Sequence, residues 1–360
     1  MSFFNDLSGQ DNLILGADLS YVNELEDCGG FYTENGTRSD PFLLFAKSGA
    51  NLVRVRLWHS PTWTNYSTYP DVEKTIRRTK EAGMKILLDF HYSDDWADPQ
   101  KQIIPSAWSN IEELSVLLDS IYDYTYKVIH RLDSKGLLPE MVQIGNEINN
   151  EILKHEPYQT TDTINWSRNI ALINKAIQAV NDACTHSSLV PKIMIQIAQP
   201  ENALIWFDKA FKNNLSDFDI IGISYYSKWS DYSMSELYQA IGLLRKKFGK
   251  EVIVAETAYP WTLKNFDEAG NILGEDTLVE GYPTTPEGQY NYMVDLTKTV
   301  IKGGGTGIIY WEPAWITSPC STHWGKGSRW ENAAFFDPDN QNEPLPVMNF
   351  FSQEYTRQIK

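Results

Sequence analysis

Eight short apolar segments, separated by longer amphipathic stretches, constrain the fold of this chain more than any other feature. We expect β-strands at residues 13–18, 52–57, 85–90, 141–145, 192–197, 220–224, 251–255 and 307–311. The hydrophobic periodicity between them predicts helices, of which the clearest are residues 71–82, 112–131, 163–183, 234–248 and 286–301. Near-continuously apolar strands that alternate with helices are typical of a parallel sheet buried on both faces. Eight such units predict a (β/α)8 barrel, the TIM barrel of the α/β class.

A doubly wound open sheet is the structural alternative. That fold usually carries a glycine-rich phosphate-binding turn after the first strand, whereas residues 16–20 here read Gly-Ala-Asp-Leu-Ser. The alternation continues without a low-complexity linker, so we expect residues 1–360 to form a single catalytic domain. Two long loops follow the seventh and eighth strands, at residues 261–283 and 312–342. In a barrel both loops lie at the carboxyl ends of the strands, where long loops are commonly functional.

The net charge of the chain indicates which kinds of molecule it can bind. The chain has 31 basic and 47 acidic residues, a net charge of −16 at pH 7. Nucleic acids and anionic membrane surfaces attract basic patches, so we expect no nucleic-acid partner and a neutral substrate. No segment approaches the roughly 20 apolar residues of a membrane span. Residues 1–7 lack the basic region and apolar run of a signal peptide.

The cysteine count is low. Cys28, Cys184 and Cys320 are too few and too scattered for a disulfide framework or a zinc site. A single disulfide stays open as an alternative, so cysteine usage does not fix the redox compartment.

Polar side chains collect at the ends of almost all the expected strands. They are Asp18, Arg54, Arg56, Asp89, His91, Asn146, Glu147, Ser224, Tyr226, Glu256, Trp311 and Glu312. A barrel interior is normally filled by branched apolar side chains, and buried polar groups are costly unless they are paired. One such residue would indicate a satisfied core group, but a ring of them favours a functional site.

Two glutamates stand out in this ring. Glu147 follows the fourth strand and Glu256 follows the seventh, and both strands deliver their carboxylates at the mouth of the barrel. Paired carboxylates are the groups that cut a glycosidic bond, with a separation of about 5–5.5 Å in retaining enzymes. We expect Glu147, beside the amide of Asn146, to act as general acid/base, and Glu256 to act as nucleophile.

The remaining polar residues admit two interpretations each. Arg54 and Arg56 share one face of the second strand, so they could hold Glu256 ionised, as could Tyr226; the alternative is a structural ion pair with Asp18 or Asp89. His91 lies in a segment with several aspartates and could be a metal ligand. No H-x-H or H-E-x-x-H pattern supports a catalytic zinc ion, so we favour a hydrogen-bonding role for His91.

Tryptophans follow several of the strands. Each could pack in the core or stack on a sugar, because sugar C–H faces pack well on aromatic rings. We expect Trp311 to form the floor of the sugar site next to the scissile bond, with Trp96, Trp229 and Trp261 as further substrate contacts. Trp58 and Trp315 are open to either interpretation.

Seven segments in order resemble glycoside hydrolase family 53, at residues 53–58, 87–94, 96–99, 142–150, 221–226, 256–262 and 310–316. They include Val-Arg-Val-Arg-Leu-Trp, Val-Gln-Ile-Gly-Asn-Glu-Ile-Asn-Asn and Tyr-Trp-Glu-Pro-Ala-Trp-Ile, and the resemblance runs from about residue 16 to residue 349.

The resemblance implies an arabinogalactan endo-β-1,4-galactanase that hydrolyses the β-1,4-galactan side chains of pectin with retention. It also implies Glu147 as acid/base and Glu256 as nucleophile, and a secreted, periplasmic or cell-surface location. We expect the protein to be a monomer. Another retaining β-glycanase of the same clan, acting on mannan, xylan or glucan, is the alternative. A catalytically inactive sugar-binding barrel and a metal-dependent barrel hydrolase are the other classes of function to separate from it.

Two segments depart from the family pattern. Several bacterial relatives carry a calcium site between the loops after the seventh and eighth strands. Residues 263–276 here offer oxygen ligands at a different spacing, from Asp267, Glu268, Asn271, Glu275 and Asp276. We therefore expect no required cofactor and do not favour a structural calcium ion. The segment at residues 194–199, in and after the fifth strand, lacks the His/Asp pattern of the family.

Overall fold

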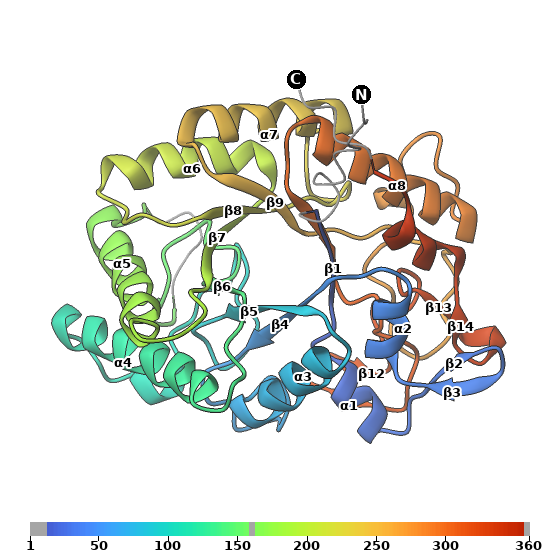
Figure 1. Cartoon of the computed structure of the whole chain (residues 1–360), viewed down its shortest axis with the longest axis horizontal. Helices are drawn as coiled ribbons and strands as arrows, with labels where there is room; N and C mark the ends of the chain where they lie inside the picture. The colour runs from blue at the N-terminus through green and yellow to red at the C-terminus, as the bar shows by residue number, and fades with distance from the viewer. Residues whose placement is uncertain (1–12, 158–162, 356–360) are drawn as a thin grey trace, which may run out of the picture.

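The computed structural model describes residues 13–157 and 163–355, and the expected barrel is confirmed. Eight parallel strands close on themselves inside a ring of helices (Figure 1). In chain order the barrel strands are β1 (Ile14–Asp18), β4 (Leu52–Leu57), β5 (Lys85–Phe90), β6 (Met141–Ile144), β7 (Lys192–Ala198), β8 (Ile220–Ser224), β9 (Glu251–Glu256) and β10 (Gly307–Tyr310). The expectation about residues 1–7 lies outside the described residues.

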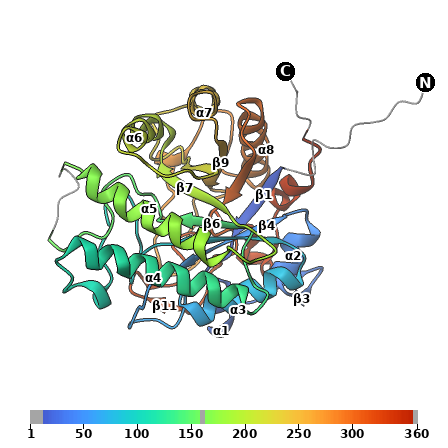
Figure 2. The ribbon, with the colours of Figure 1, turned by 60° about the vertical axis from the view of Figure 1, so that its left-hand side comes forward.

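All five expected helices are present, with ends that shift by at most three residues. They are α3 (Tyr69–Glu81), α4 (Leu114–Asp133), α5 (Trp166–Ala183), α7 (Met234–Phe248) and α8 (Pro286–Lys302). Helix α5 begins three residues later than expected because Asn165 caps it, its side chain accepting from the backbone N–H of Arg168. Figure 2 shows α4 and α5 packed side by side outside the strands.

Three further helices were not expected, namely α1 (Val22–Asp27), α2 (Pro41–Lys47) and α6 (Pro200–Lys212). The first two have only six and seven residues, too short for a periodic signal. The start signal of α2 is nevertheless in the sequence: Asp40 accepts from the backbone N–H of Phe42, with Pro41 in the first turn. A 3-10 segment, η5 (Pro346–Ser352), takes the place of a helix after β10 and packs on α8.

The two-residue period of the strands explains why a polar layer lies next to an apolar layer inside the barrel. Inside the barrel, one layer is made by Ile14, Leu52, Leu87, Met141, Met194, Ile220, Ile253, Ala255 and Ile309. Two residues further along a strand the side chain points inward again, which places Arg54, Asp89, Gln143 and Gln196 in the next layer toward the carboxyl ends. Gly222 makes room for Met194 of the apolar layer, since a Cβ on Gly222 would lie 2.8 Å from Met194 Sδ.

Small elements cover the rest of the catalytic face. Three hairpins are formed by β2 (Tyr32–Glu34) with β3 (Thr37–Ser39), β11 (Ser321–Thr322) with β12 (Gly325–Lys326), and β13 (Phe336–Asp337) with β14 (Glu343–Pro344). A disulfide joins Cys28, at the end of α1, to Cys320 in the loop after β10. This bond ties two segments that are 292 residues apart in the sequence.

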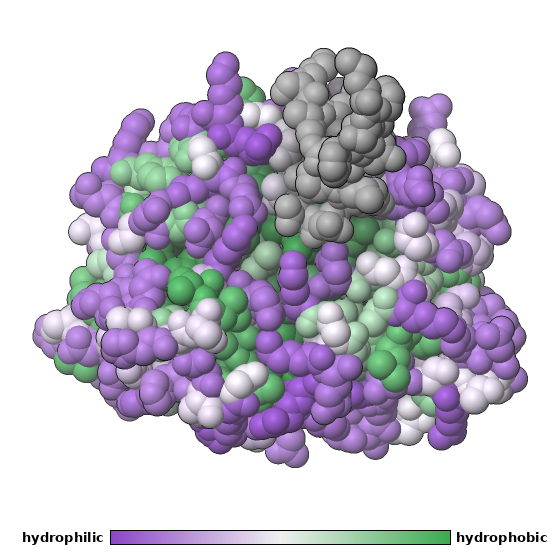
Figure 3. Space-filling view, viewed as in Figure 1, coloured by the Kyte–Doolittle hydropathy of each residue, from purple (hydrophilic) through white to green (hydrophobic). Residues whose placement is uncertain are grey.

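The face of the molecule drawn in Figure 3 is mainly polar. Hydrophilic residues make up most of the rim in Figure 3, and hydrophobic residues show between them toward the middle of that face. Within residues 13–157 and 163–355, no helix combines the length and apolar character needed to cross a membrane.

Candidate active site

A tight backbone turn after β6 presents Glu147. Gly145 has a φ of +76° and Glu147 a φ of +44°, so the chain reverses direction within three residues. A Cβ on Gly145 would lie 2.5 Å from Ile148 Cγ2, which explains the glycine. Gln102 Nε2 donates to the carbonyl oxygen of Asn146 at 2.8 Å and supports the turn. The turn directs Glu147 into the mouth of the barrel.

A β-bulge between β8 and β9 positions Glu256. Ile223 pairs with Val254, but the next residue, Ser224, pairs with Glu256, so Ala255 is the extra residue of the bulge. Bulges commonly re-aim side chains beside active sites. Here the bulge brings the carboxylate of Glu256 level with the hydroxyl of Ser224.

Arg54 lies at the centre of the polar layer and is almost completely buried among acceptor groups. Its guanidinium donates to Asp18 Oδ2 at 2.9 Å, to Asp89 Oδ2 at 2.8 Å and to Asn146 Oδ1 at 2.6 Å. It also forms an ion pair with Glu256 Oε1 at 2.8 Å. Both expectations for this arginine therefore hold geometrically, because it pairs with the two aspartates and contacts Glu256 as well.

Arg56 has different neighbours. Its guanidinium pairs with Glu312 at 2.9 Å and lies over the rings of Tyr21 and Trp96, with Cζ 4.3 Å from each ring centroid. It therefore makes neither the expected contact with Glu256 nor the alternative pair with Asp18 or Asp89. Its partner Glu312 follows β10, which is separated from β4 by β1 in the closed barrel.

Gln196 and Ser224 connect the two glutamates, and Gln143 supports Gln196. Gln143 Nε2 donates to Gln196 Oε1 at 2.6 Å, and Gln196 Nε2 donates to Glu256 Oε1 at 3.0 Å and to Ser224 Oγ at 3.1 Å. Ser224 Oγ in turn donates to Glu147 Oε1 at 2.5 Å. Both glutamines were missing from the expected site, although the period-two alternation of β6 and β7 points them inward.

The surroundings of the two carboxyl groups shift their pKa values to different extents. Burial raises the pKa of Glu147 well above its usual range, and the negative charge of Glu256 raises it further, while the Ser224 hydroxyl and Arg54 lower it. Burial also raises the pKa of Glu256, but Arg54 and Gln196 act in the opposite direction. Tyr226 donates to Glu256 Oε2 at 3.1 Å as well. Glu256 is therefore the first of the pair to ionise, and Glu147 keeps its proton to higher pH.

His91 is held in one tautomer by its neighbours. Its Nδ1 accepts from the backbone N–H of Ala97 at 3.1 Å, so the ring proton is on Nε2, which faces Asp89 Oδ2 at 3.0 Å. The histidine thus lines the site with a fixed orientation, and its partners are an amide and a carboxylate rather than a cluster of metal ligands.

A cleft of about 590 Å³ opens above these groups. Of the residues expected at the site, it is lined by Asp18, Arg54, Arg56, His91, Trp96, Asn146, Glu147, Tyr226, Trp229, Glu256 and Trp311. Asp89 and Ser224 lie beneath this lining, where they hold Arg54 and Glu147. Loop residues that were not expected complete the walls, among them Asp98, Gln199, Trp324, Arg329 and Trp330.

Trp261 is not in the cleft, so that expectation was wrong. Its side chain is 8% exposed, its ring stacks on Phe266 with centroids 5.6 Å apart, and its Nε1 donates to the carbonyl oxygen of Glu331. The residue belongs to the packing between the two long loops. Proximity to a strand end did not separate this core tryptophan from those in the cleft.

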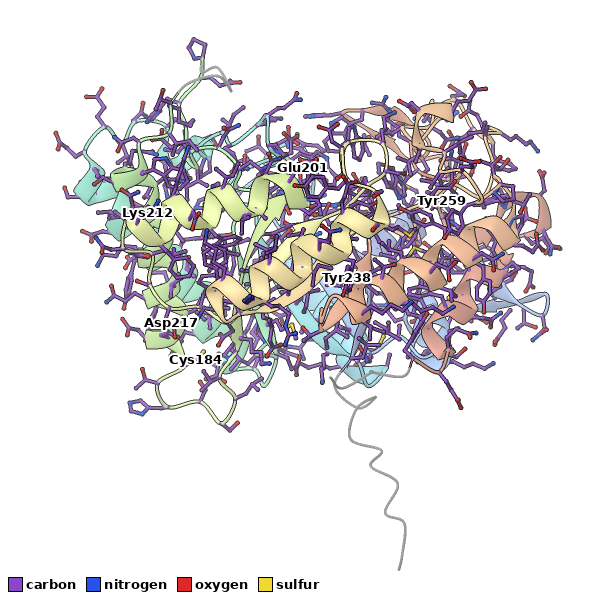
Figure 4. All side chains as sticks on the ribbon, turned by 90° about the horizontal axis from the view of Figure 1, so that it is seen from above. Cys184, Glu201, Lys212, Asp217, Tyr238 and Tyr259 are labelled. Atoms are coloured by element: carbon purple, nitrogen blue, oxygen red, sulfur yellow. A yellow bond between two sulfur atoms is a disulfide. The ribbon has the colours of Figure 1, made fainter. Side chains whose placement is uncertain are left out.

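The cleft tryptophans form a connected aromatic wall. Trp311 lies next to Trp96, Trp315 and Trp330, with ring centroids 4.7–6.1 Å apart. Trp229 stands apart from them and is 44% exposed. The loop that follows it is anchored by Glu201, which accepts from Ser230 Oγ at 2.9 Å. Figure 4 labels Glu201 at the start of α6, close to where the chain enters α7.

Three acidic side chains of residues 263–276 have protein partners. Asp267 accepts from the backbone N–H groups of Ala269 and Ser328, and Glu268 and Asp276 pair with Lys326 and Lys228. Within the described ranges no three His, Cys, Asp or Glu side chains are grouped as metal ligands. This donor set does not fit a calcium ion, which needs about six to eight oxygens.

The fold and the site together define a (β/α)8-barrel glycoside hydrolase, with paired carboxylates on the fourth and seventh barrel strands. Residues 14–351 match glycosyl hydrolase family 53, and the chain belongs to this family.

Several relatives are similar over most of the chain. An arabinogalactan endo-beta-1,4-galactanase of Cellvibrio japonicus is 52% identical over 95% of this chain and 91% of its own length. An endo-beta-1,4-galactanase of Bacillus subtilis is 34% identical over 91% of this chain and 79% of its own length. Among solved structures, the Ignisphaera aggregans GH53 catalytic domain superposes with a TM-score of 0.87 and 32% identity, covering 99% of this chain and 100% of that one.

Proposed function

We propose that this protein is a retaining endo-β-1,4-galactanase that hydrolyses the β-1,4-galactan side chains of pectin. The observation that carries the proposal is the single donor network that joins Glu147 to Glu256 through Ser224 and Gln196. Membership in family 53 and the names of its relatives support galactan as the substrate. The net charge of −16 suits a neutral polymer.

In the first step of the proposed mechanism, Glu256 attacks the anomeric carbon of the sugar. Donation from Arg54, Gln196 and Tyr226 keeps the Glu256 carboxylate ionised and oriented. Glu147 gives its proton to the leaving glycosidic oxygen, since its raised pKa preserves the acid form. The products of this step are a covalent glycosyl-enzyme and a shortened galactan chain.

In the second step, water replaces Glu256. Glu147 is now ionised and accepts a proton from the attacking water, and the anomeric carbon regains its β configuration. The pKa of Glu147 is lower at this stage, because Glu256 is esterified and its negative charge no longer repels the ionised form of Glu147. The hydrogen bond from Ser224 stabilises the ionised form of Glu147.

The cleft residues have proposed binding roles. Asp18, His91 and Asn146 present polar groups to the sugar at the centre of the cleft, with Trp311 as its floor. Trp96 and Trp229 supply faces for sugars further along the chain, and Trp324 and Trp330 extend this aromatic wall.

We also propose that the enzyme works outside the cytoplasm, as a monomer and without a cofactor. A polymeric substrate suits an enzyme that works outside the cell, and the disulfide between Cys28 and Cys320 suits an oxidising compartment. The occupied oxygens of residues 263–276 support independence from calcium, and unchanged activity after treatment with a chelator tests it.

The decisive experiment is digestion of purified β-1,4-galactan, with products resolved by size over time. A spread of oligomers early in the reaction would establish endo-galactanase action. Hydrolysis of mannan, xylan or β-glucan with no attack on galactan would refute the substrate and keep the mechanism. NMR of the first product tests retention, because α-configured sugar appearing first would rule it out.

A further inference from the structure

A one-directional chain of hydrogen bonds ends at the acid/base. It runs from Gln143 Nε2 to Gln196 Oε1, from Gln196 Nε2 to Ser224 Oγ, and from Ser224 Oγ to Glu147 Oε1. The four side chains come from β6, β7, β8 and the turn after β6, and the first three are completely buried. The direction of donation along these hydrogen bonds has a chemical consequence only if a neighbouring group fixes the orientation of the two amides.

Arg54 fixes that direction, because a guanidinium only donates. Its Nε donates to Gln143 Oε1 and its Nη2 to Gln196 Oε1, each at 3.3 Å. If either amide flipped, an NH2 group would face the guanidinium. Asp89 adds the same constraint, since its Oδ1 accepts from Gln143 Nε2 at 2.7 Å. Gln196 must therefore turn its NH2 group toward Ser224 and Glu256.

The serine hydroxyl then has one acceptor for its proton. It receives a hydrogen bond from Gln196, and among residues 13–157 and 163–355 the Glu147 carboxylate is the group that accepts from it. Glu147 Oε1 is thus an acceptor in both protonation states. When Glu147 is the acid, its proton must be on the other oxygen, Oε2.

We infer that Ser224 and Gln196 are positioning residues that place the acidic proton of Glu147 on Oε2 and keep Oε1 as a permanent acceptor. This inference rests on the proposed role of Glu147 as general acid/base. It gives Ser224 a role beneath the cleft lining in place of a substrate contact. It also gives the glutamine of β7, where the sequence departs from the family pattern, a function of its own.

The test uses Ser224→Ala and measures the titration of the Glu147 side chain by 13C NMR, with Glu147→Gln to assign the resonance. The other charged groups that act on Glu147 are Glu256, Asp98 and Arg54, and the variant keeps all three. Loss of the serine donor removes stabilisation from the ionised form, so the Glu147 titration should move to higher pH. An unchanged or lower titration in a folded variant would overturn the inference.

Tyr226→Phe is the matched control, since it also removes one buried hydroxyl but from Glu256. It should not raise the titration of Glu147. A similar rise in both variants would overturn the inference, because a general loss of packing would then explain it.

A second variant and a kinetic measurement cover the case in which Ser224→Ala does not fold. In Gln196→Met the serine hydroxyl loses the group that orients it. We expect kcat/KM on aryl β-galactobiosides to depend more steeply on the leaving phenol, because misplacing the proton forfeits part of the roughly 10²–10⁴-fold effect of general-acid catalysis. An unchanged dependence would contradict the inference.

The NMR titration does not require galactan. A Glu147 titration that moves as expected in a protein inactive on galactan would refute only the proposed substrate. Galactan hydrolysis with an unmoved titration would refute only the role of Ser224 and Gln196.

Discussion

Arg54 Nη2 lies 2.8 Å from Glu256 Oε1, and both side chains are buried at the top of the barrel. The same guanidinium contacts Asp18 and Asp89. One cation therefore pairs with three carboxylates, and it also orients Gln143 and Gln196, of which Gln196 links the catalytic pair through Ser224. Stability and catalysis depend on the same side chain.

Replacement of Arg54 by alanine should reduce both the stability of the protein and its activity. The variant leaves buried carboxylates without their counter-charge, which costs about 3–5 kcal/mol for a broken buried pair. Urea unfolding at neutral pH measures the loss. Arg77→Ala is the control, since Arg77 forms a half-exposed pair with Glu73 on α3 and should cost at most about 0.5 kcal/mol. Equal effects of the two substitutions would contradict the argument.

Substitution of either glutamate should abolish most activity without unfolding the protein. Glu256→Ala removes the nucleophile, and Glu147→Ala removes a group worth roughly 10²–10⁴-fold. Azide should rescue Glu256→Ala to an α-glycosyl azide and Glu147→Ala to a β-glycosyl azide, because they leave space on opposite faces of the sugar. Glu251→Gln, at the other end of β9 and paired with Lys192, should keep its activity. Retained activity in Glu256→Ala would refute the mechanism.

Most of the barrel could be predicted from the sequence, because strand and helix periods are local properties. The polar ring followed from the positions of strand ends, and the inward direction of Gln143 and Gln196 could have been read from the same alternation. The bulge that aligns Glu256 with Ser224 could not, since it depends on pairing between β8 and β9. Nor could the loop walls be predicted, because their conformations depend on tertiary contacts such as the disulfide.

The pH profile should respond to Asp98, which lines the cleft and raises the pKa of Glu147 by its negative charge. Activity requires ionised Glu256 and protonated Glu147, so kcat/KM falls at low pH as Glu256 gains a proton and at high pH as Glu147 loses one. In Asp98→Asn the pKa of Glu147 falls, and the alkaline limb should move to lower pH. A limb that stays in place or moves upward in kcat/KM measurements would contradict this assignment.

The disulfide should stabilise the loop that carries Trp324 and Trp330. Removing a native disulfide typically costs about 2–5 kcal/mol, because the bond restricts the unfolded chain. A reductant should therefore lower the Tm of the wild-type protein and leave that of a Cys28→Ser/Cys320→Ser double variant unchanged. Cys184→Ala, at the free buried cysteine, should remain sensitive to reductant. Insensitivity of the wild-type protein would show that the bond does not support the fold.

Two tryptophans of the catalytic face should respond in opposite ways to replacement by alanine. Trp229 is 44% exposed in the cleft wall, so its loss removes a stacking surface but little packing. We expect the KM for galactan to rise several-fold, the free energy of unfolding to change little, and Trp229→Tyr to be intermediate because it keeps a ring. Trp261 is buried on Phe266, so Trp261→Ala should cost about 3–5 kcal/mol of stability with an unchanged KM in the folded fraction. Initial rates across galactan concentrations and urea unfolding separate the two effects. A higher KM in the Trp261 variant would indicate that Trp261 contacts the substrate after all. An unchanged KM in the Trp229 variant would show that Trp229 does not contribute to substrate binding.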